Sequence, residues 1–402
     1  MRRRVVITGM GVCSPLGHSL QDFSDALFAG RSALSLLECA ADNGNITIPA
    51  AVTSFDSGTH FSKLELTTLD RFSQMALLAG RKALADYPAE QYGARTGVYL
   101  GCGMGGATQI ETTYRDLFLK GARRVRPVSV INIMANAAAG HLAIRHRLSG
   151  PNVTFSNACA SSANALGEAM RAIRHGYIDA AVAGGAESLL VYGAVHAWHA
   201  LGVLAKPASD VATSCRPFSA DRSGLVLGEG AALLLLESEE QALARGATIL
   251  AELVGYGESC DASHLTKPAA EGQVRAMRGA LADAGLAPGS IGYINAHGTA
   301  TRAGDVEETA AIRETFGPMA PPVSASKSIH GHLLGASGAL ECVATVCALR
   351  EQRLPPTMHL TQPDPQCDLD FVPGQSRAAS FDYALTNSFA FGGSNASLIL
   401  RR

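Results

Sequence analysis

Short apolar runs alternate with amphipathic stretches along this chain of 402 residues. A strand with one solvent-exposed face alternates apolar and polar residues. This alternation is missing from the runs Val5–Thr8, Thr96–Leu100 and Ala180–Gly184, which therefore predict strands buried on both faces. Segments with helical periodicity lie between them and predict helices over Leu20–Leu27 and Ala163–Arg174. This order of elements predicts an α/β fold in which helices cover the strands on both sides.

Similar short patterns recur in the two parts of the chain. Thr96–Gly101 resembles Ile291–Ala296, and Gly230–Leu236 resembles Gly393–Leu400. The two pairs occur in the same order, which predicts two similar halves packed against each other. We place these halves at 1–247 and 248–402.

Composition narrows the function classes. The chain is 47% hydrophobic and carries a net charge of −2, so it can bury a large core but has no overall field that would attract nucleic acid or an anionic membrane. Apolar runs do not approach the roughly 20 residues of a membrane span. The nine cysteines are odd in number, scattered and never spaced as CxxC. This pattern disfavours a disulfide framework or a zinc site and predicts a reducing, cytoplasmic environment.

Cys159 lies where a predicted strand passes through small residues into a predicted helix. A helix start offers partial positive charge and free backbone N–H groups, which we expect to lower the pKa of the thiol and to bind a thioester oxygen. A buried structural cysteine is the alternative for an isolated thiol. The segments described next favour a nucleophile.

Two further segments supply candidate partners for the thiol. His297 follows an apolar strand, at the strand end where α/β proteins collect ligand sites. Lys327 and His332 flank a glycine turn before a helix rich in Gly and Ala. A neutral imidazole can donate a hydrogen bond to a developing enolate, and a lysine can stabilise an anion nearby. Together these residues predict acyl-transfer chemistry at Cys159.

With these residues in place, the chain resembles the β-ketoacyl-[acyl-carrier-protein] synthases of the thiolase superfamily, most of all the synthase II type. The resemblance extends from Val5–Gly11 to the final strand. It includes Gly184–Glu187, Arg216–Phe218, Gly228–Gly230 and Asn387–Asn395.

The resemblance implies a thiolase-like fold, with two pseudo-symmetric halves in five αβαβα layers, and a decarboxylative Claisen condensation in fatty acid biosynthesis. Cys159 would accept an acyl chain from acyl carrier protein. His297 and His332 would then stabilise the enolate formed from malonyl-carrier protein. The resemblance implies no metal and no other cofactor. It also implies a homodimer, with a heterodimer of homologous subunits as the alternative.

Further site residues follow from the resemblance alone. The backbone N–H groups of Cys159 and Phe391 would form the oxyanion hole, and Phe389 would gate the nucleophile. Lys327 would organise the site with acidic partners at Asp305 and Glu308. Asp261 and Glu341 would be polar residues near the site.

The chain departs from the family pattern at three positions. His330 replaces a threonine before the Gly-His pair, where it could affect the pH profile or serve as a wall residue. Arg302 stands where proline is common. Trp198 replaces a phenylalanine near the acyl pocket or the dimer interface, and a packing role is favoured over a role in specificity. Acidic carrier proteins need basic contacts, for which 120–126 and Arg71 are candidates.

Other functions stay open. The chain could be a ketosynthase of a specialised polyketide or polyene pathway, paired with a silent homologous subunit. It could also be a non-catalytic chain-length subunit, although such subunits typically lose the nucleophile, and Cys159 is present here. A degradative thiolase is disfavoured because the turn Asn387–Phe391 lacks a second cysteine.

Overall fold

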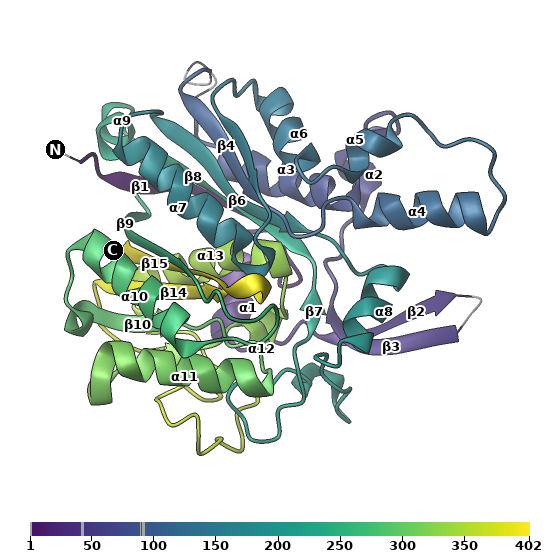
Figure 1. The fold of residues 1–402 in the computed structure, drawn as a ribbon. Coiled ribbons are helices and arrows are strands. Elements are labelled where there is room, and N and C mark those ends of the chain that lie inside the picture. The colour runs from purple at the N-terminus through teal and green to yellow at the C-terminus, as the bar shows by residue number, and fades with distance from the viewer. Residues whose placement is uncertain (1, 42–43, 89, 91–92) are drawn as a thin grey trace.

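In the described part of the chain, ten strands hydrogen-bond into one sheet through the middle of the molecule (Figure 1). The structure is a computed structural model, and it describes residues 2–41, 44–88, 90 and 93–402. The strands of the sheet are β1 (Val5–Cys13), β4 (Thr96–Gly101), β5 (Asn152–Phe155), β6 (Ala180–Glu187), β8 (Gly230–Ser238), β9 (Ala251–Cys260), β10 (Ile291–Asn295), β11 (Val323–Ser324), β14 (Tyr383–Phe389) and β15 (Ser394–Arg401).

The strand pairing in the first half repeats in the second. β1 pairs antiparallel with β8 and β8 antiparallel with β6, whereas β6, β4 and β5 follow in parallel. β9, β15, β14, β10 and β11 repeat these relations in the same order. The sequence similarities therefore join equivalent strands, β4 with β10 and β8 with β15. The division at 247/248 falls between α9 (Glu239–Ala244) and β9, and it stays a prediction.

Helices complete the five predicted layers. α3 (Arg71–Ala83) and α6 (Ala137–His146) share an apolar core with the outer face of the first half, and α10 (Ala270–Ala284) and α11 (Arg302–Phe316) do so on the second. Between the halves, a third core contains residues of α7 (Ser161–Arg174) and α13 (Ser337–Glu351). The predicted αβαβα architecture is confirmed.

The helix α13 lies in the central layer and lacks the amphipathic pattern of a surface helix. Every residue of α13 from Ser337 to Leu349 is buried, which is why the segment is apolar all round instead of amphipathic. Small residues let α13 approach α7 closely. A Cβ atom added at Gly338 would lie 3.0 Å from the Cβ of Ala163. The two helices that begin at the candidate site are therefore packed directly against each other.

Shorter elements surround this frame. β2, β3 and β7 form a three-stranded sheet, and β12 pairs with β13. Among the described residues, no helix combines the length and the apolar character needed to cross a bilayer. The remaining elements are α1 (Leu20–Phe28), β2 (Ser35–Ala41), β3 (Gly44–Ala51), α2 (Ser57–His60), η1 (Glu65–Thr67), α4 (Ala107–Phe118), α5 (Ser129–Ile133), η3 (Ala158–Ala160), α8 (Tyr192–Ala200), η4 (Val211–Thr213), β7 (Leu227–Gly228), η5 (Pro288–Ser290), η6 (Gly317–Met319), α12 (Lys327–His330), η7 (Leu334–Ala336), β12 (Arg353–Leu354), β13 (Arg377–Ala378) and η8 (Phe391–Gly393).

Candidate active site

Cys159 sits in a tight turn between β5 and α7. The preceding Ala158 has φ 45°, a left-handed conformation that costs energy for a residue with a side chain. The hydroxyl of Ser161 braces the turn, since it accepts the N–H of Asn157 (2.9 Å) and donates to the carbonyl of Ala158 (2.6 Å). The second half repeats the turn before α13, where Leu334 has φ 43°. The pseudo-symmetry thus extends to the turn that carries the sulfur.

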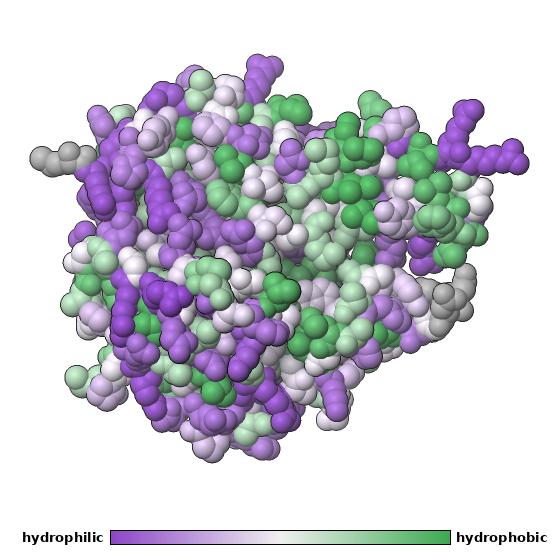
Figure 2. Space-filling view, in the orientation of Figure 1, coloured by the Kyte–Doolittle hydropathy of each residue, from purple (hydrophilic) through white to green (hydrophobic). Residues whose placement is uncertain are grey.

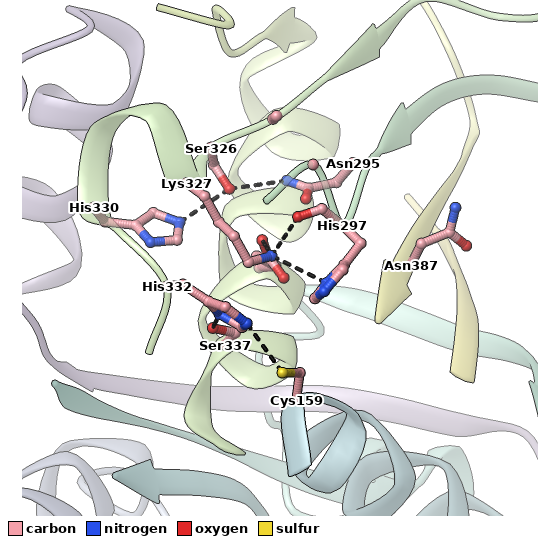
Figure 3. A network of polar contacts seen from close by, with 12 residues as sticks. Cys159, Asn295, His297, Ser326, Lys327, His330, His332, Ser337 and Asn387 are labelled. Carbon is pink, nitrogen blue, oxygen red and sulfur yellow. Dashed lines mark hydrogen bonds and ion pairs between the residues drawn. The ribbon is translucent and has the colours of Figure 1, made fainter. Parts of the chain in front are cut away.

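Lys327 determines which nitrogen of His297 carries the hydrogen. The Lys327 Nζ lies 2.5 Å from Glu341 Oε1, 2.6 Å from the carbonyl oxygen of His297 and 3.3 Å from His297 Nδ1. An ammonium group only donates, so Nδ1 must accept and the ring hydrogen resides on Nε2. His297 therefore offers an N–H donor on the side away from the lysine (Figure 3).

His332 contacts the sulfur itself. Its Nε2 lies 3.0 Å from Cys159 Sγ, and its Nδ1 lies 2.8 Å from the hydroxyl of Ser337, the first residue of α13. A serine hydroxyl can donate or accept, so His332, unlike His297, can hold its hydrogen on either nitrogen. The two imidazole rings meet edge to face with centroids 5.3 Å apart.

These groups converge from both halves of the molecule. The sulfur of Cys159 and one ring nitrogen each of His297 and His332 all lie within 4.8 Å of one another, and all three side chains are buried. Cysteine and histidine are also donors that zinc accepts, so the expected absence of a metal stays a prediction. The structure thus brings together the nucleophile and both histidines that the sequence indicates.

Burial dominates the protonation of the site. It raises the pKa of Cys159 to about 12, although Lys327 and the backbone N–H groups of Phe391 and Cys159 oppose the shift. The expectation of a lowered thiol pKa is therefore wrong, because the helix start does not compensate for the loss of water. Burial, and then the charge of Lys327, lower the pKa of His297 and His332 well below the ordinary value. Near neutral pH the site holds a thiol and two uncharged imidazoles.

The buried acidic residues hold different parts of the site. Lys327 forms its ion pair with Glu341. Glu308 instead accepts the backbone N–H groups of His297 (2.8 Å) and the following glycine, and Asp305 accepts that of Ala300 (3.0 Å). Burial raises the pKa of Asp305 to about 7 and also raises that of Glu308. Asp305 and Glu308 thus hold the loop that carries His297, and the charge of Lys327 also acts on Glu308, so their expected role as acidic partners of Lys327 stays a prediction.

The predicted oxyanion turn lines the same cavity as the histidines. Phe391 begins η8, and the backbone N–H of Phe391 and that of Cys159 both act on the sulfur. The ring of Trp198 stacks on the ring of Phe391 with centroids 5.8 Å apart. Phe389 is buried at the end of β14 and contacts His297 edge to face. Asp261 braces the turn, because its N–H donates to the carbonyl of Gly393 (2.9 Å).

One cavity of about 360 Å³ connects these groups with the surface. Its walls include the sulfur-bearing residue, both histidines and the aromatic residues of the turn and the gate: Cys159, Trp198, His297, His332, Phe389 and Phe391.

The comparisons with known proteins agree with this geometry. The family models described as "Beta-ketoacyl synthase, N-terminal domain" and "Beta-ketoacyl synthase, C-terminal domain" match residues 2–242 and 250–361. The chain belongs to the β-ketoacyl synthase family. It is 41% identical over 409 residues to 3-oxoacyl-[acyl-carrier-protein] synthase 2 of Synechocystis sp., and the match covers 100% of this chain and 98% of the relative.

Two solved structures extend the likeness of this β-ketoacyl synthase. The ishigamide ketosynthase/chain length factor superposes with a TM-score of 0.93 at 36% identity, with 100% of this chain and 99% of that chain covered. A type II polyketide acyl-carrier protein in complex with its ketosynthase gives a TM-score of 0.91 at 30% identity, with 100% of both chains covered. These likenesses confirm the predicted family and its fold.

The structure places His330 in the interior, Arg302 at the cavity and Arg71 in an internal ion pair. His330 is fully buried and bonds through its two ring nitrogens to the Gly331 carbonyl (2.8 Å) and the Ser326 hydroxyl (3.0 Å), as a wall residue would. Arg302 lines the mouth of the cavity. Arg71 is paired internally with Glu229 at 2.6 Å, so it does not fit the expected carrier-protein contact.

Sequence reasoning gave no role to two buried residues. Ser337 contacts Nδ1 of His332 and allows its hydrogen on either ring nitrogen, and only the position of Ser337 at a helix start could have indicated this contact. Glu187 accepts the N–H groups of Gly103 (2.7 Å), Met104 (3.2 Å) and Gly335 (3.1 Å). It thereby joins the loop after β4 to the turn before α13. The place of Glu187 in the family motif Gly184–Glu187 could have indicated that this residue has a role.

Proposed function

We propose that this β-ketoacyl synthase is a 3-oxoacyl-[acyl-carrier-protein] synthase of fatty acid biosynthesis that works through an acyl-Cys159 intermediate. The observation that carries the proposal is the meeting of the Cys159 sulfur with the nitrogens of His297 and His332 in one buried cavity. The 41% identity to a relative named 3-oxoacyl-[acyl-carrier-protein] synthase 2 supports the substrate class.

In the first half-reaction, the Cys159 sulfur attacks the thioester carbonyl of the acyl donor. The new S–C bond forms as the carrier thiol leaves, and the proton of Cys159 passes through His332 Nε2 to that thiol. The serine hydroxyl on Nδ1 allows this exchange because it can donate or accept. The N–H groups of Cys159 and Phe391 bind the tetrahedral oxyanion, and each such donor contributes roughly 3–4 kcal/mol.

In the second half-reaction, the malonyl thioester loses CO₂ and the electron pair of the broken C–C bond becomes an enolate. His297 Nε2–H and His332 Nε2–H donate to the enolate oxygen. Both are neutral donors because their pKa values are lowered by burial and by Lys327. The carbanion then attacks the acyl carbonyl, the cysteine thiolate leaves, and it takes up one proton from solvent through His332, because the first proton left with the carrier thiol. The products are CO₂, a 3-oxoacyl thioester and free enzyme.

The test is mass spectrometry of the intact chain after incubation with acyl-carrier protein. The chain should gain the mass of one acyl group, located on Cys159 by peptide mapping. Cys159→Ala should gain none and should lose condensation. Cys260→Ala, which removes an exposed thiol, is the matched control and should behave as the unmodified chain. Near-normal condensation by Cys159→Ala would remove Cys159 as the nucleophile.

The proposed partners are acyl- and malonyl-loaded carrier proteins and a second copy of the chain. The neighbour with a bound acyl-carrier protein supports the first. For the second, β5 is an edge strand of the sheet, and exposed apolar residues lie on it and on nearby helices. Figure 2 shows hydrophobic residues gathered on this side, over α4 and α5. The residues of this apolar edge surface are Phe118, Leu119, Val130, Ile131, Met134, Ile144 and Val153.

The second candidate is a ketosynthase of a specialised polyene or polyketide pathway, paired with a homologous subunit. The likeness to the ishigamide ketosynthase/chain length factor favours it. Sedimentation of the purified chain alone distinguishes the two candidate functions. A fatty acid synthase that is a homodimer should dimerise by itself, whereas a ketosynthase that needs a homologous subunit should not. The products made from carrier proteins loaded with acyl groups of different chain length complete the distinction.

The nine cysteines are all unpaired, which supports a cytoplasmic location.

A further inference from the structure

The mouth of the active-site cavity carries two exposed basic side chains. Lys267 and Arg302 line the same cavity as Cys159. Lys267 lies in the loop that follows β9, and Arg302 is the first residue of α11. The two cations come from separate segments and meet only through the fold, at the solvent end of the path to the sulfur.

Neither side chain forms an ion pair within the described part of the chain, although Asp364 lies near enough for its charge to act on Arg302. The nearby acids are already engaged. Asp364 pairs with Arg222 at 2.6 Å, and Asp261 accepts the side-chain amide of Asn395 at 2.7 Å. The start of α11 adds the positive end of a helix dipole beside Arg302. An anion of the substrate would therefore find two cations at the mouth that no ion pair holds.

The segments that carry the two cations are held in place. The ring nitrogen Nδ1 of His264 accepts the backbone N–H of Lys267 (3.2 Å), and the carbonyl of Leu265 accepts that of Gly392 (2.7 Å) in the oxyanion turn. On the other side, the carbonyl of Arg302 accepts the Nη2 of Arg222 (2.8 Å). The backbone that carries the two side chains is therefore already ordered, so only the side chains lose entropy when they bind a ligand.

We infer that Lys267 and Arg302 bind the phosphodiester of the phosphopantetheine arm that delivers the acyl group from the carrier protein. The inference rests on the proposed function. While the thioester end of the arm reacts at Cys159, the phosphate end stays at the mouth, where a planar guanidinium and an ammonium match its oxygens.

This site differs from the basic segment 120–126. That segment is exposed but does not line the cavity, so it can contact only the body of a carrier protein. Lys267 and Arg302 instead bind the phosphate of the phosphopantetheine arm. A small thioester that carries the phosphate but no protein should therefore still use the site.

The experiment compares two small acyl donors, an acyl-pantetheine and its 4′-phosphate ester, on the full chain. The acylation of Cys159 is followed by intact mass, and kcat/KM is measured for both donors. The unmodified chain should prefer the phosphorylated donor. Arg302→Gln and Lys267→Gln should each reduce this preference about 3–10-fold, which corresponds to a partly solvated charge contact. Arg302→Lys should keep most of it.

Arg81→Gln is the matched control, because it removes one exposed cation of α3 far from the cavity lining and should leave the preference unchanged. Equal kcat/KM for the two donors, or an unchanged preference in the double variant, would overturn the phosphate site while labelling of Cys159 still supports the proposed function. Failure of every donor, including acyl-carrier protein, to label Cys159 would overturn the proposed function and this inference with it.

Discussion

At the scale of single residues, the two histidines differ in what fixes their hydrogens. A lysine that can only donate holds His297 in one tautomer, whereas a serine hydroxyl leaves His332 free to exchange. The distinction matters because only His332 contacts the sulfur, at 3.0 Å. The His297 ring is suited to donate a hydrogen bond throughout the reaction cycle. The His332 ring can both accept and donate a proton.

His297→Ala should therefore separate the two half-reactions. We expect malonyl decarboxylation to fall by about 10²–10⁴-fold, the usual contribution of a positioned proton donor, and acyl transfer to Cys159 to fall much less. His332→Ala should slow both. The two rates are measured by CO₂ release and by intact mass. Equal loss of acyl transfer in the two variants would contradict this division of roles.

A second prediction at this scale concerns pH. Since burial raises the pKa of Cys159 to about 12, the reactive thiolate is a minor species that increases about tenfold with each pH unit below that value. Alkylation of Cys159 by a small haloacetamide, followed by peptide mass spectrometry, should rise through pH 7–9 without a plateau. A plateau near neutral pH would show a thiolate stabilised beyond what the surroundings of the sulfur supply.

At the scale of elements, the site depends on how closely α7 and α13 approach, because each helix begins at a turn that carries part of it. Gly338→Ala should displace α13 from its neighbours, since the new methyl group would lie 2.8 Å from the Ser388 hydroxyl on β14 and 3.0 Å from the backbone nitrogen and the Cβ of Ala163 on α7. We expect the free energy of unfolding to fall by about 1–3 kcal/mol, as in other overpacked cores, and condensation to weaken with it.

Gly140→Ala in α6 is the matched control. A Cβ atom there would meet nothing within 4 Å, so the substitution should stabilise the chain by about 0.4–1 kcal/mol. Urea unfolding measures both variants. If Gly338→Ala were as stable as Gly140→Ala, the close contact would not limit the packing of the central layer.

At the scale of the whole molecule, exposed apolar residues gather on the edge surface beside β5, as is typical of a protein–protein interface. Ile131→Asp should place a charge in the proposed dimer interface and weaken self-association about tenfold or more. Met319→Asp alters an equally apolar, 90% exposed residue in the other half and should not. Analytical ultracentrifugation over a concentration series distinguishes them, and unchanged association of Ile131→Asp would move the interface elsewhere.

Several buried strands, their flanking helices and the two similar halves could be predicted from the sequence, because apolar runs, helical periodicity and recurring short patterns are local features. Cys159, His297, Lys327 and His332 were also recognisable, since each lies at a strand end or a glycine turn. α13 left no helical periodicity, because it is buried on all sides.

The sequence by itself indicated the family through its motifs and, by that resemblance, the five layers and the proposed reacting groups, since motifs and residue types are local properties. Only the tertiary structure decided that Lys327 pairs with Glu341, that the thiol pKa rises, that Arg71 is neutralised internally and that Lys267 and Arg302 share the cavity mouth. Charge partners and solvent exposure depend on residues far apart in the chain, so no local pattern could reveal them.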